Sequence, residues 1–127
     1  MACPQTLRQR RMLRHIIAKR RYDLMSSSGV KVRDITIAFG RPVGVMGAYQ
    51  CFFQIDGVAW GGIRRAVGTD AVQALLLAMT RAATHLYNSD EFKSGLILLN
   101  GCRNLDLPLI RLDGAEVVPD PMLHLTV

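Results

Sequence analysis

The chain has 127 residues, half of them apolar and a fifth charged, a composition typical of one packed domain and not of a disordered, collagen-like or coiled-coil protein. The three cysteines, Cys3, Cys51 and Cys102, are widely spaced without a C-x-x-C pair, so neither a disulfide framework nor a zinc site is indicated. No apolar run approaches the roughly 18 residues of a membrane span. We expect a cytoplasmic protein that needs no metal or organic cofactor.

Charge is concentrated at the start of the chain. The formal net charge is +6, and seven of the sixteen bases lie in the first twenty-one residues, where there is no acid. These seven cations are Arg8, Arg10, Arg11, Arg14, Lys19, Arg20 and Arg21. Such a segment predicts salt-sensitive, sequence-blind attraction to a polyanion, although a solvated tail is the more common outcome. We therefore expect a basic N-terminal arm or short helix in residues 1–15, before a single domain in residues 16–127.

The first half of the chain predicts strands. After an extended segment at Ile16–Met25 and a turn at residues 26–29, residues 30–39 are rich in β-branched side chains. Their alternation changes parity near Arg33-Asp34, which predicts a β-bulge there. Glycine and proline recur through residues 40–47 and predict a loop.

The next strand has the clearest alternation, with Cys51, Phe53 and Ile55 on one face. Asp56-Gly57 after it is a strong signal for a two-residue hairpin turn. Residues 63–67 would form the returning strand, with Gly61-Gly62 as a bulge or as part of a wider hairpin tip.

A long amphipathic helix is predicted over residues 70–88. Apolar residues fill one half of its wheel, and Asp70 followed by Gln73 has the spacing of a capping box. Leu77 falls on the polar half, near Arg81. The apolar run at residues 96–99 predicts an inner strand covered on both faces. The fold class is therefore α+β: an antiparallel sheet of about four to five strands packed by one helix.

Three segments together resemble a family of small bacterial proteins known only as a domain of unknown function. They are Phe39-Gly40-Arg41-Pro42, Ile55-Asp56-Gly57, and the run from Arg64 through Gly68-Thr69-Asp70 to Leu75. The resemblance implies a bacterial source and a sheet-plus-helix fold, and it carries no activity or site residues. It spans about residues 16–108, so the basic arm looks like an addition to the family pattern.

No residue pattern predicts catalysis. His15, His85 and His124 lie on different elements without a ligand-like neighbour, so an exposed His85 on the helix is favoured. The glycines before the helix do not have the spacing of a phosphate loop, and the acidic cap Asp70 would repel an anion. Turn geometry explains them better.

The residues that we single out are those typical of binding surfaces. Trp60 lies in a glycine-flanked hairpin tip, where it either anchors a partner or packs on its own hairpin. Arg64 and Arg65 precede the helix and could clamp an acidic partner or a phosphate. An account at least as good is that one points outward on the strand and that the other lies at the sheet edge with its guanidinium in water. The full set of predicted partner-binding residues is Arg8, Arg10, Arg11, Arg14, Trp60, Arg64, Arg65, Leu77 and Arg81.

The function that we expect is that of a non-catalytic bacterial protein that binds another macromolecule. Its most concrete form is an immunity or antitoxin-type protein that occludes a cognate toxin. The alternative is a nucleic-acid-associated protein that uses the basic arm, and an enzyme with its acid or base in residues 40–48 is a weaker third.

Overall fold

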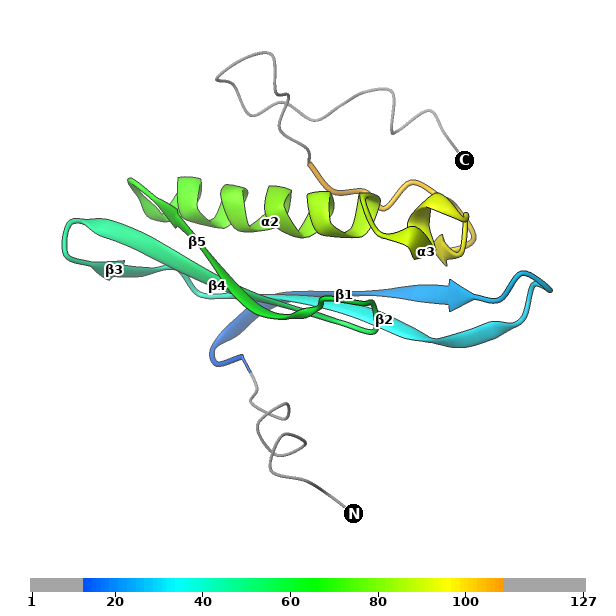
Figure 1. Ribbon diagram of the computed structural model, residues 1–127. Helices are drawn as coiled ribbons and strands as arrows, with labels where there is room; N and C mark the ends of the chain where they lie inside the picture. The colour runs from blue at the N-terminus through cyan, green and yellow to red at the C-terminus, as the bar shows by residue number, and fades with distance from the viewer. Residues whose placement is uncertain (1–12, 109–127) are drawn as a thin grey trace, which may run out of the picture.

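The computed structural model describes residues 13–108, which form two layers. An antiparallel six-stranded sheet makes one layer, and a single long helix, α2 (Ala71–Tyr87), lies across one face of it (Figure 1). The strands are β1 (Ile16–Met25), β2 (Lys31–Gly40), β3 (Val43–Val45), β4 (Ala48–Asp56), β5 (Gly62–Gly68) and β6 (Ile97–Leu98). A short helix, α3 (Asp90–Lys93), follows α2. The predicted α+β class is confirmed.

Strand β4 organises the sheet. β5 pairs with it from Tyr49 to Ile55 along one edge, so β2 and β3 must share the other edge, end to end. β1 pairs with β2, and β6 pairs only with the end of β1. This arrangement leaves β5 and the hairpin that leads into it at one side of the sheet, and β1 with β6 at the other.

The core lies between the sheet and α2, as the strand alternation predicts. Ile35, Ile37 and Phe39 of β2 face the helix together with Cys51, Phe53 and Ile55 of β4, and all six are buried. The helix meets them mainly with alanines: Ala74, Ala78, Ala82 and Ala83. These small side chains let α2 approach closely, and at Gly68 the approach is so close that a Cβ atom would lie 2.5 Å from the backbone nitrogen of Ala74.

The ends of α2 agree with the predicted helix. Its N-terminal cap differs from the predicted capping box in one hydrogen bond. The Asp70 carboxylate accepts a hydrogen bond from the Gln73 amide at 2.8 Å, and Asn88 caps the other end. Gln73 does not reach back to the amide of Asp70. Its Oε1 atom accepts instead from the amide of Thr69 at 2.6 Å and from the Thr69 hydroxyl.

Two predictions about strands are wrong. The sheet has six strands, not four or five, because part of the predicted loop at residues 40–47 forms β3. Met46 and Gly47 then both take positive φ angles, of 50° and 84°, and close the β3–β4 hairpin in two residues. The run at residues 96–99 yields the short strand β6 at the end of the sheet order, not an inner strand.

For the β4–β5 hairpin the predicted two-residue turn at Asp56-Gly57 is wrong, whereas the alternative, a wider tip, is confirmed. Ile55 pairs with Gly62, so the β4–β5 hairpin has a wide tip that includes Val58–Gly61. The bulge lies at Val32, next to the predicted position, because Leu24 pairs with Arg33 and Met25 with Lys31.

The predicted outward position of Leu77 is corrected by the structure. Leu77 is partly buried against the core cluster, and Thr80, placed on the polar half by the wheel, is only 1% exposed. The Thr80 hydroxyl donates to the Leu77 carbonyl at 2.9 Å, which satisfies this buried polar group within the helix. Leu77 therefore contributes to the core.

Most of the basic arm, with Arg8, Arg10 and Arg11, lies outside the described residues. Leu13 is described and buried, and it lies on the face of the sheet opposite α2: a Cβ atom on Gly40 would lie 3.6 Å from its Cδ1 atom. Its amide donates to the Gln54 side chain at 3.3 Å. The chain thus enters the sheet from the face that α2 leaves uncovered.

Candidate functional site

A cleft of about 550 Å³ lies between the tip of the β4–β5 hairpin and the helical layer. The buried ring of Phe53 forms part of its lining, and the rest comes from the hairpin, β5, the second half of α2 and the start of α3. The lining residues are Phe53, Ala59, Trp60, Arg64, Arg81, Thr84, His85, Asn88, Ser89, Asp90 and Glu91. Three of the predicted partner-binding residues, Trp60, Arg64 and Arg81, therefore meet at one site.

The two arginines are held by backbone carbonyls. Arg64 donates from Nη2 to the carbonyl of Trp60, and Arg81 donates from Nη1 to the carbonyl of Arg65 at 2.9 Å. Each of these bonds uses one of the five N–H groups of a guanidinium. The contacts orient both heads without neutralising their charge.

The hairpin tip is tied to the helices by its own backbone. The carbonyl of Ala59 lies 3.1 Å from Nε2 of His85, and the amide of Ala59 donates to Glu91 over 3.5 Å. These two contacts join the tip to α2 and to α3. The loop at the hairpin tip is therefore bonded to both helices that line the cleft.

Trp60 projects from this anchored tip. Its side chain is 85% exposed, and its φ angle of 63° is in the left-handed region, which a non-glycine residue adopts at a cost of about 1–2 kcal/mol. An exposed indole gains little packing that would offset this cost. Backbone strain of this kind is typical of functional sites.

The ion pairs of the described residues lie away from the cleft and involve three acids, Asp23, Asp34 and Asp106. Arg20 pairs with Asp106, Arg21 with Asp34, and Lys31 with both Asp23 and Asp34. Within residues 13–108, neither Arg64 nor Arg81 has a carboxylate within 4.0 Å. The two guanidiniums are therefore not ion-paired, whereas Asp90 and Glu91 add acidic groups to the lining of the same cleft.

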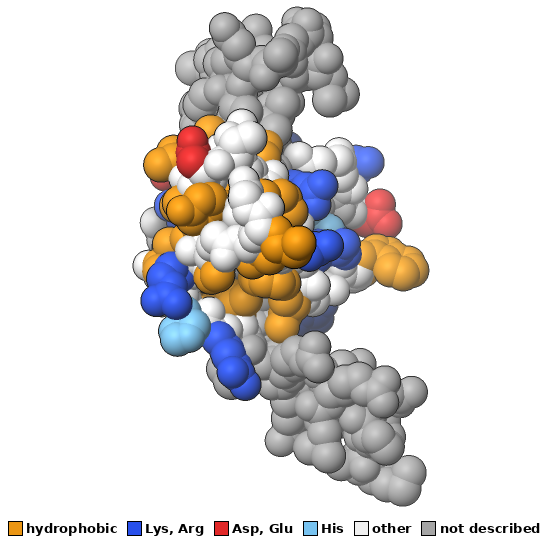
Figure 2. All heavy atoms as spheres, turned by 90° about the vertical axis from the view of Figure 1, so that its left-hand side faces the viewer, with side chains coloured by type: hydrophobic (Ala, Val, Ile, Leu, Met, Phe, Trp, Pro, Cys, Tyr) orange, Lys and Arg blue, Asp and Glu red, His pale blue; other side chains and the backbone are white. Residues whose placement is uncertain are grey.

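The space-filling view shows the charge and apolarity of this part of the molecule. Basic, histidine and acidic side chains gather along one side in Figure 2, with a hydrophobic side chain standing out beside them. Further hydrophobic side chains gather at the centre of the view, over the end with the β3–β4 hairpin and the start of α2. Exposed apolar residues of these elements include Val43, Val45, Met46 and Val72, and Val67 of the adjacent β5 is exposed as well.

The other predicted residues lie away from the cleft. Arg65 is on the opposite face of the sheet, where it donates to the Gln50 side chain at 3.0 Å. Arg14 is exposed next to the buried Leu13. Leu77 packs against the core, as described above, and Arg8, Arg10 and Arg11 lie outside the described residues.

His85, Asp90 and Glu91 also line this cleft, although the sequence patterns did not predict them as site residues. His85 lies four positions after Arg81, so both face the same side of α2, and this spacing was a usable signal. Nothing in the sequence placed Asp90 and Glu91 beside a hairpin tip some thirty residues earlier, because that proximity depends on how α3 turns back after Asn88.

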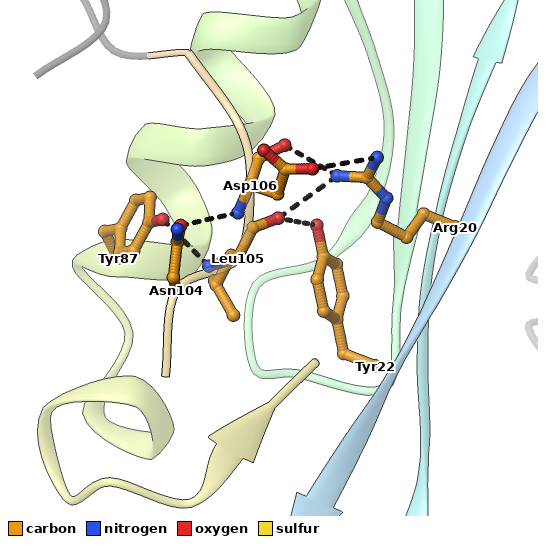
Figure 3. A network of polar contacts seen from close by, with 6 residues as sticks. All are labelled: Arg20, Tyr22, Tyr87, Asn104, Leu105 and Asp106. Atoms are coloured by element: carbon orange, nitrogen blue, oxygen red, sulfur yellow. Dashed lines mark hydrogen bonds and ion pairs between the residues drawn. The ribbon is translucent and has the colours of Figure 1, made fainter. Parts of the chain in front are cut away.

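The opposite side of α2 is closed by the chain itself, as Figure 3 shows. The segment after β6 runs beside the helix, where the Tyr22 hydroxyl donates to the carbonyl of Leu105 at 2.9 Å and the Leu105 amide donates to the Tyr87 hydroxyl at 3.1 Å. Arg20 donates to the carbonyls of Leu105 and Asp106. Burial raises the pKa of Tyr22 to about 12, although the nearby Arg20 opposes the shift.

Two further kinds of feature are absent from residues 13–108. Over this range no three His, Cys, Asp or Glu side chains come together as metal ligands would. No helix in the same range is long and apolar enough to cross a bilayer.

Comparison with known proteins places the chain in a family. The family model described as "Domain of unknown function (DUF6968)" matches residues 18–109, which is most of the chain, so the protein belongs to this family. The matched range includes strands β2 to β6, helix α2 and every residue of the cleft. No curated protein and no solved structure matches the chain significantly.

Proposed function

We propose that this protein is a non-catalytic binding protein that holds a protein partner at the cleft around Trp60. Its most concrete form is an immunity or antitoxin-type bacterial protein that neutralises a cognate toxin in the cytoplasm. The observation that carries this proposal is the 85% exposed Trp60 beside two guanidiniums that have no carboxylate partner among the described residues.

Tryptophan and arginine are the residue types that contribute most to protein–protein binding when they become buried. In this cleft both arginines are already oriented by carbonyls, and the hairpin tip is tied to α2 and α3. A partner would therefore meet a preorganised site and lose little side-chain entropy on binding.

The polar groups of the cleft support binding in preference to catalysis. The hydroxyl groups of Thr84 and Ser89 donate to the carbonyls of Thr80 and Leu86, at 2.9 and 2.6 Å, and not to His85. His85 itself contacts the carbonyl of Ala59. Nucleophilic catalysis needs a hydroxyl or thiol next to a base, and burial raises the pKa of the Cys51 thiol, away from the thiolate.

The test uses the product of the adjacent gene, because an immunity protein is expected to be encoded beside its toxin. Mixing the two purified proteins should give a complex on size-exclusion chromatography and a blue shift of Trp60 fluorescence, since Trp60 is the only tryptophan of this chain. A partner without tryptophan, or with its tryptophans replaced, keeps this signal specific. A complex in which Trp60 stays exposed, and which Trp60→Ala does not weaken, would contradict the proposal.

A second candidate, nucleic-acid binding, is favoured by one observation. Leu13, the first described residue, lies on the uncovered face of the sheet, which also carries Lys19, Phe52 and Arg65. Basic groups around an exposed aromatic ring suit single-stranded nucleic acid, whose bases stack on the ring while the cations contact the phosphates. Binding to unrelated DNA or RNA that falls steeply with salt, and that is lost from a variant starting at His15, would support this candidate instead.

A further inference from the structure

The cleft has two walls of opposite charge, and this asymmetry limits what it can hold. Arg64 of β5 and Arg81 of α2 form the basic wall, whereas Asp90 and Glu91 at the start of α3 form the acidic wall. Trp60 stands at the hairpin tip next to Arg64, which bonds to its carbonyl. The site therefore offers an apolar ring and two guanidiniums from the hairpin, β5 and α2, and two carboxylates from α3.

A uniform polyanion does not match this arrangement. Nucleic acid carries closely spaced phosphate charges along its whole length, so a strand drawn to Arg64 and Arg81 would also bring phosphates against Asp90 and Glu91. A protein loop can carry a carboxylate on one residue and a neutral or basic group on the next. Only the second kind of ligand satisfies both walls.

Carboxylates are the natural partners of the basic wall. A guanidinium presents paired N–H groups that fit the two oxygens of a carboxylate, and charge-assisted bonds of this kind are the stronger ones in proteins. In the free protein each of these arginines donates a hydrogen bond to a neutral backbone carbonyl, Arg64 to that of Trp60 and Arg81 to that of Arg65. An incoming carboxylate would supply the ion-pair partner that neither arginine has within 4.0 Å among residues 13–108.

We propose that the cleft recognises an acidic loop of the protein partner, with Asp or Glu side chains bound by Arg64 and Arg81 and an apolar neighbour packed on Trp60. This inference rests on the proposed function and names the chemistry of the partner. It assigns the specificity to Arg64 and Arg81, and the contact area to Trp60.

A short tryptophan-free peptide with a Glu-Leu-Glu segment flanked by lysines is the probe for this proposal, titrated at low salt into the full chain while Trp60 fluorescence is followed. We expect Arg64→Gln and Arg81→Gln each to weaken the response at least tenfold. The matched control is Arg41→Gln, which removes an equal charge from an exposed residue outside the cleft and should change the response less than twofold. Circular dichroism confirms that each variant is folded.

Single-stranded polyadenylate serves as the second arm of the experiment. Three results would overturn the proposal: no response of Trp60 to the acidic peptide, an equal loss in all three variants, or a polyadenylate response at Trp60 that is tighter and depends on Arg64 and Arg81. The proposed function fails separately, when the adjacent-gene product leaves Trp60 exposed. If that product buries Trp60 while Arg64→Gln and Arg81→Gln bind it normally, only the acidic-loop inference fails.

Discussion

The two sides of α2 differ in whether another segment of the described chain covers them. On the β1 side the segment around Leu105 fills the space beside the helix, and its backbone is bonded to Tyr22, Arg20 and Tyr87. On the β5 side no comparable segment within residues 13–108 fills the gap, and a cleft remains with Trp60 at its edge. The same helix thus has one sealed flank and one open flank.

This difference separates structural residues from candidate binding residues. On the sealed flank, Leu105 is fully buried and Tyr22 is 1% exposed, so their side chains contribute to the stability of the domain. On the open flank, Trp60 and the charged residues contribute little to the core and have groups available for another molecule. Stability and binding should therefore respond to different substitutions.

The largest expected effect is on the sealed flank. Leu105→Ala removes a fully buried side chain and should lower the free energy of unfolding by about 3 kcal/mol, through lost burial and the cavity left behind. Urea unfolding followed by circular dichroism measures this change. A loss below about 1 kcal/mol would mean that the segment around Leu105 is not a firm part of the domain.

Alkaline pH should weaken the same flank. Burial raises the pKa of Tyr22 from 10.0 to about 12, so the folded state holds this proton more tightly than the unfolded state does. The resulting stability, on the order of 2 kcal/mol, is complete below pH 10 and is lost as the pH rises toward 12.

Tyr22→Phe is the control for this pH dependence. It lacks the titrating hydroxyl but keeps Lys31, whose pKa is raised by hydrogen bonds to Asp34 and Asp23 and which also loses its proton in alkali. At pH 8 the variant should be less stable by about 1 kcal/mol, because the bond to the Leu105 carbonyl is gone. Stability curves that run parallel for the two proteins from pH 8 to 12 would refute the role of Tyr22.

On the open flank the effect on stability should be small. Trp60→Ala removes a side chain that is 85% exposed, and the expected change in unfolding free energy is within about 0.5 kcal/mol. Urea unfolding under the conditions used for Leu105→Ala gives a direct comparison. A loss similar to that of Leu105→Ala would show that Trp60 belongs to the core of its hairpin and is not free for a partner.

The smallest expected effect is that of chelation. Since we expect no metal to be needed, thermal melts with and without EDTA should coincide. A midpoint that falls by several degrees in EDTA would reveal a structural metal ion.

Local patterns predicted the parts of this fold that local chemistry decides. Alternation gave the buried face of β4 at Cys51, Phe53 and Ile55, and the Asp70–Gln73 spacing gave the start of α2. The helical wheel failed at Leu77 and Thr80, because a wheel assumes one apolar half whereas both residues are shielded in the folded domain. The prediction of a two-residue turn at Asp56-Gly57 failed because the pairing of β4 with β5 starts only at Gly62, opposite Ile55.

The candidate site shows the same limit. The sequence singled out Trp60, Arg64 and Arg81 by residue type, yet it gave no reason to place them together and did not separate Arg64 from Arg65. Strand parity makes that separation, since neighbouring residues of β5 face opposite sides of the sheet. The sealed flank was not predicted at all, because Tyr22 and Leu105 are 83 positions apart in the chain.

The most direct test of the open flank is the quenching of Trp60 by ions of opposite charge. Iodide should quench its fluorescence more strongly than caesium does, because Arg64 and Arg81 line the cleft beside the exposed ring, and the difference should shrink in the Arg64→Gln, Arg81→Gln double variant. Binding of the adjacent-gene product should then protect Trp60 from iodide. A tryptophan that neither ion reaches in the free protein, or that iodide quenches equally well in the complex, would contradict the account.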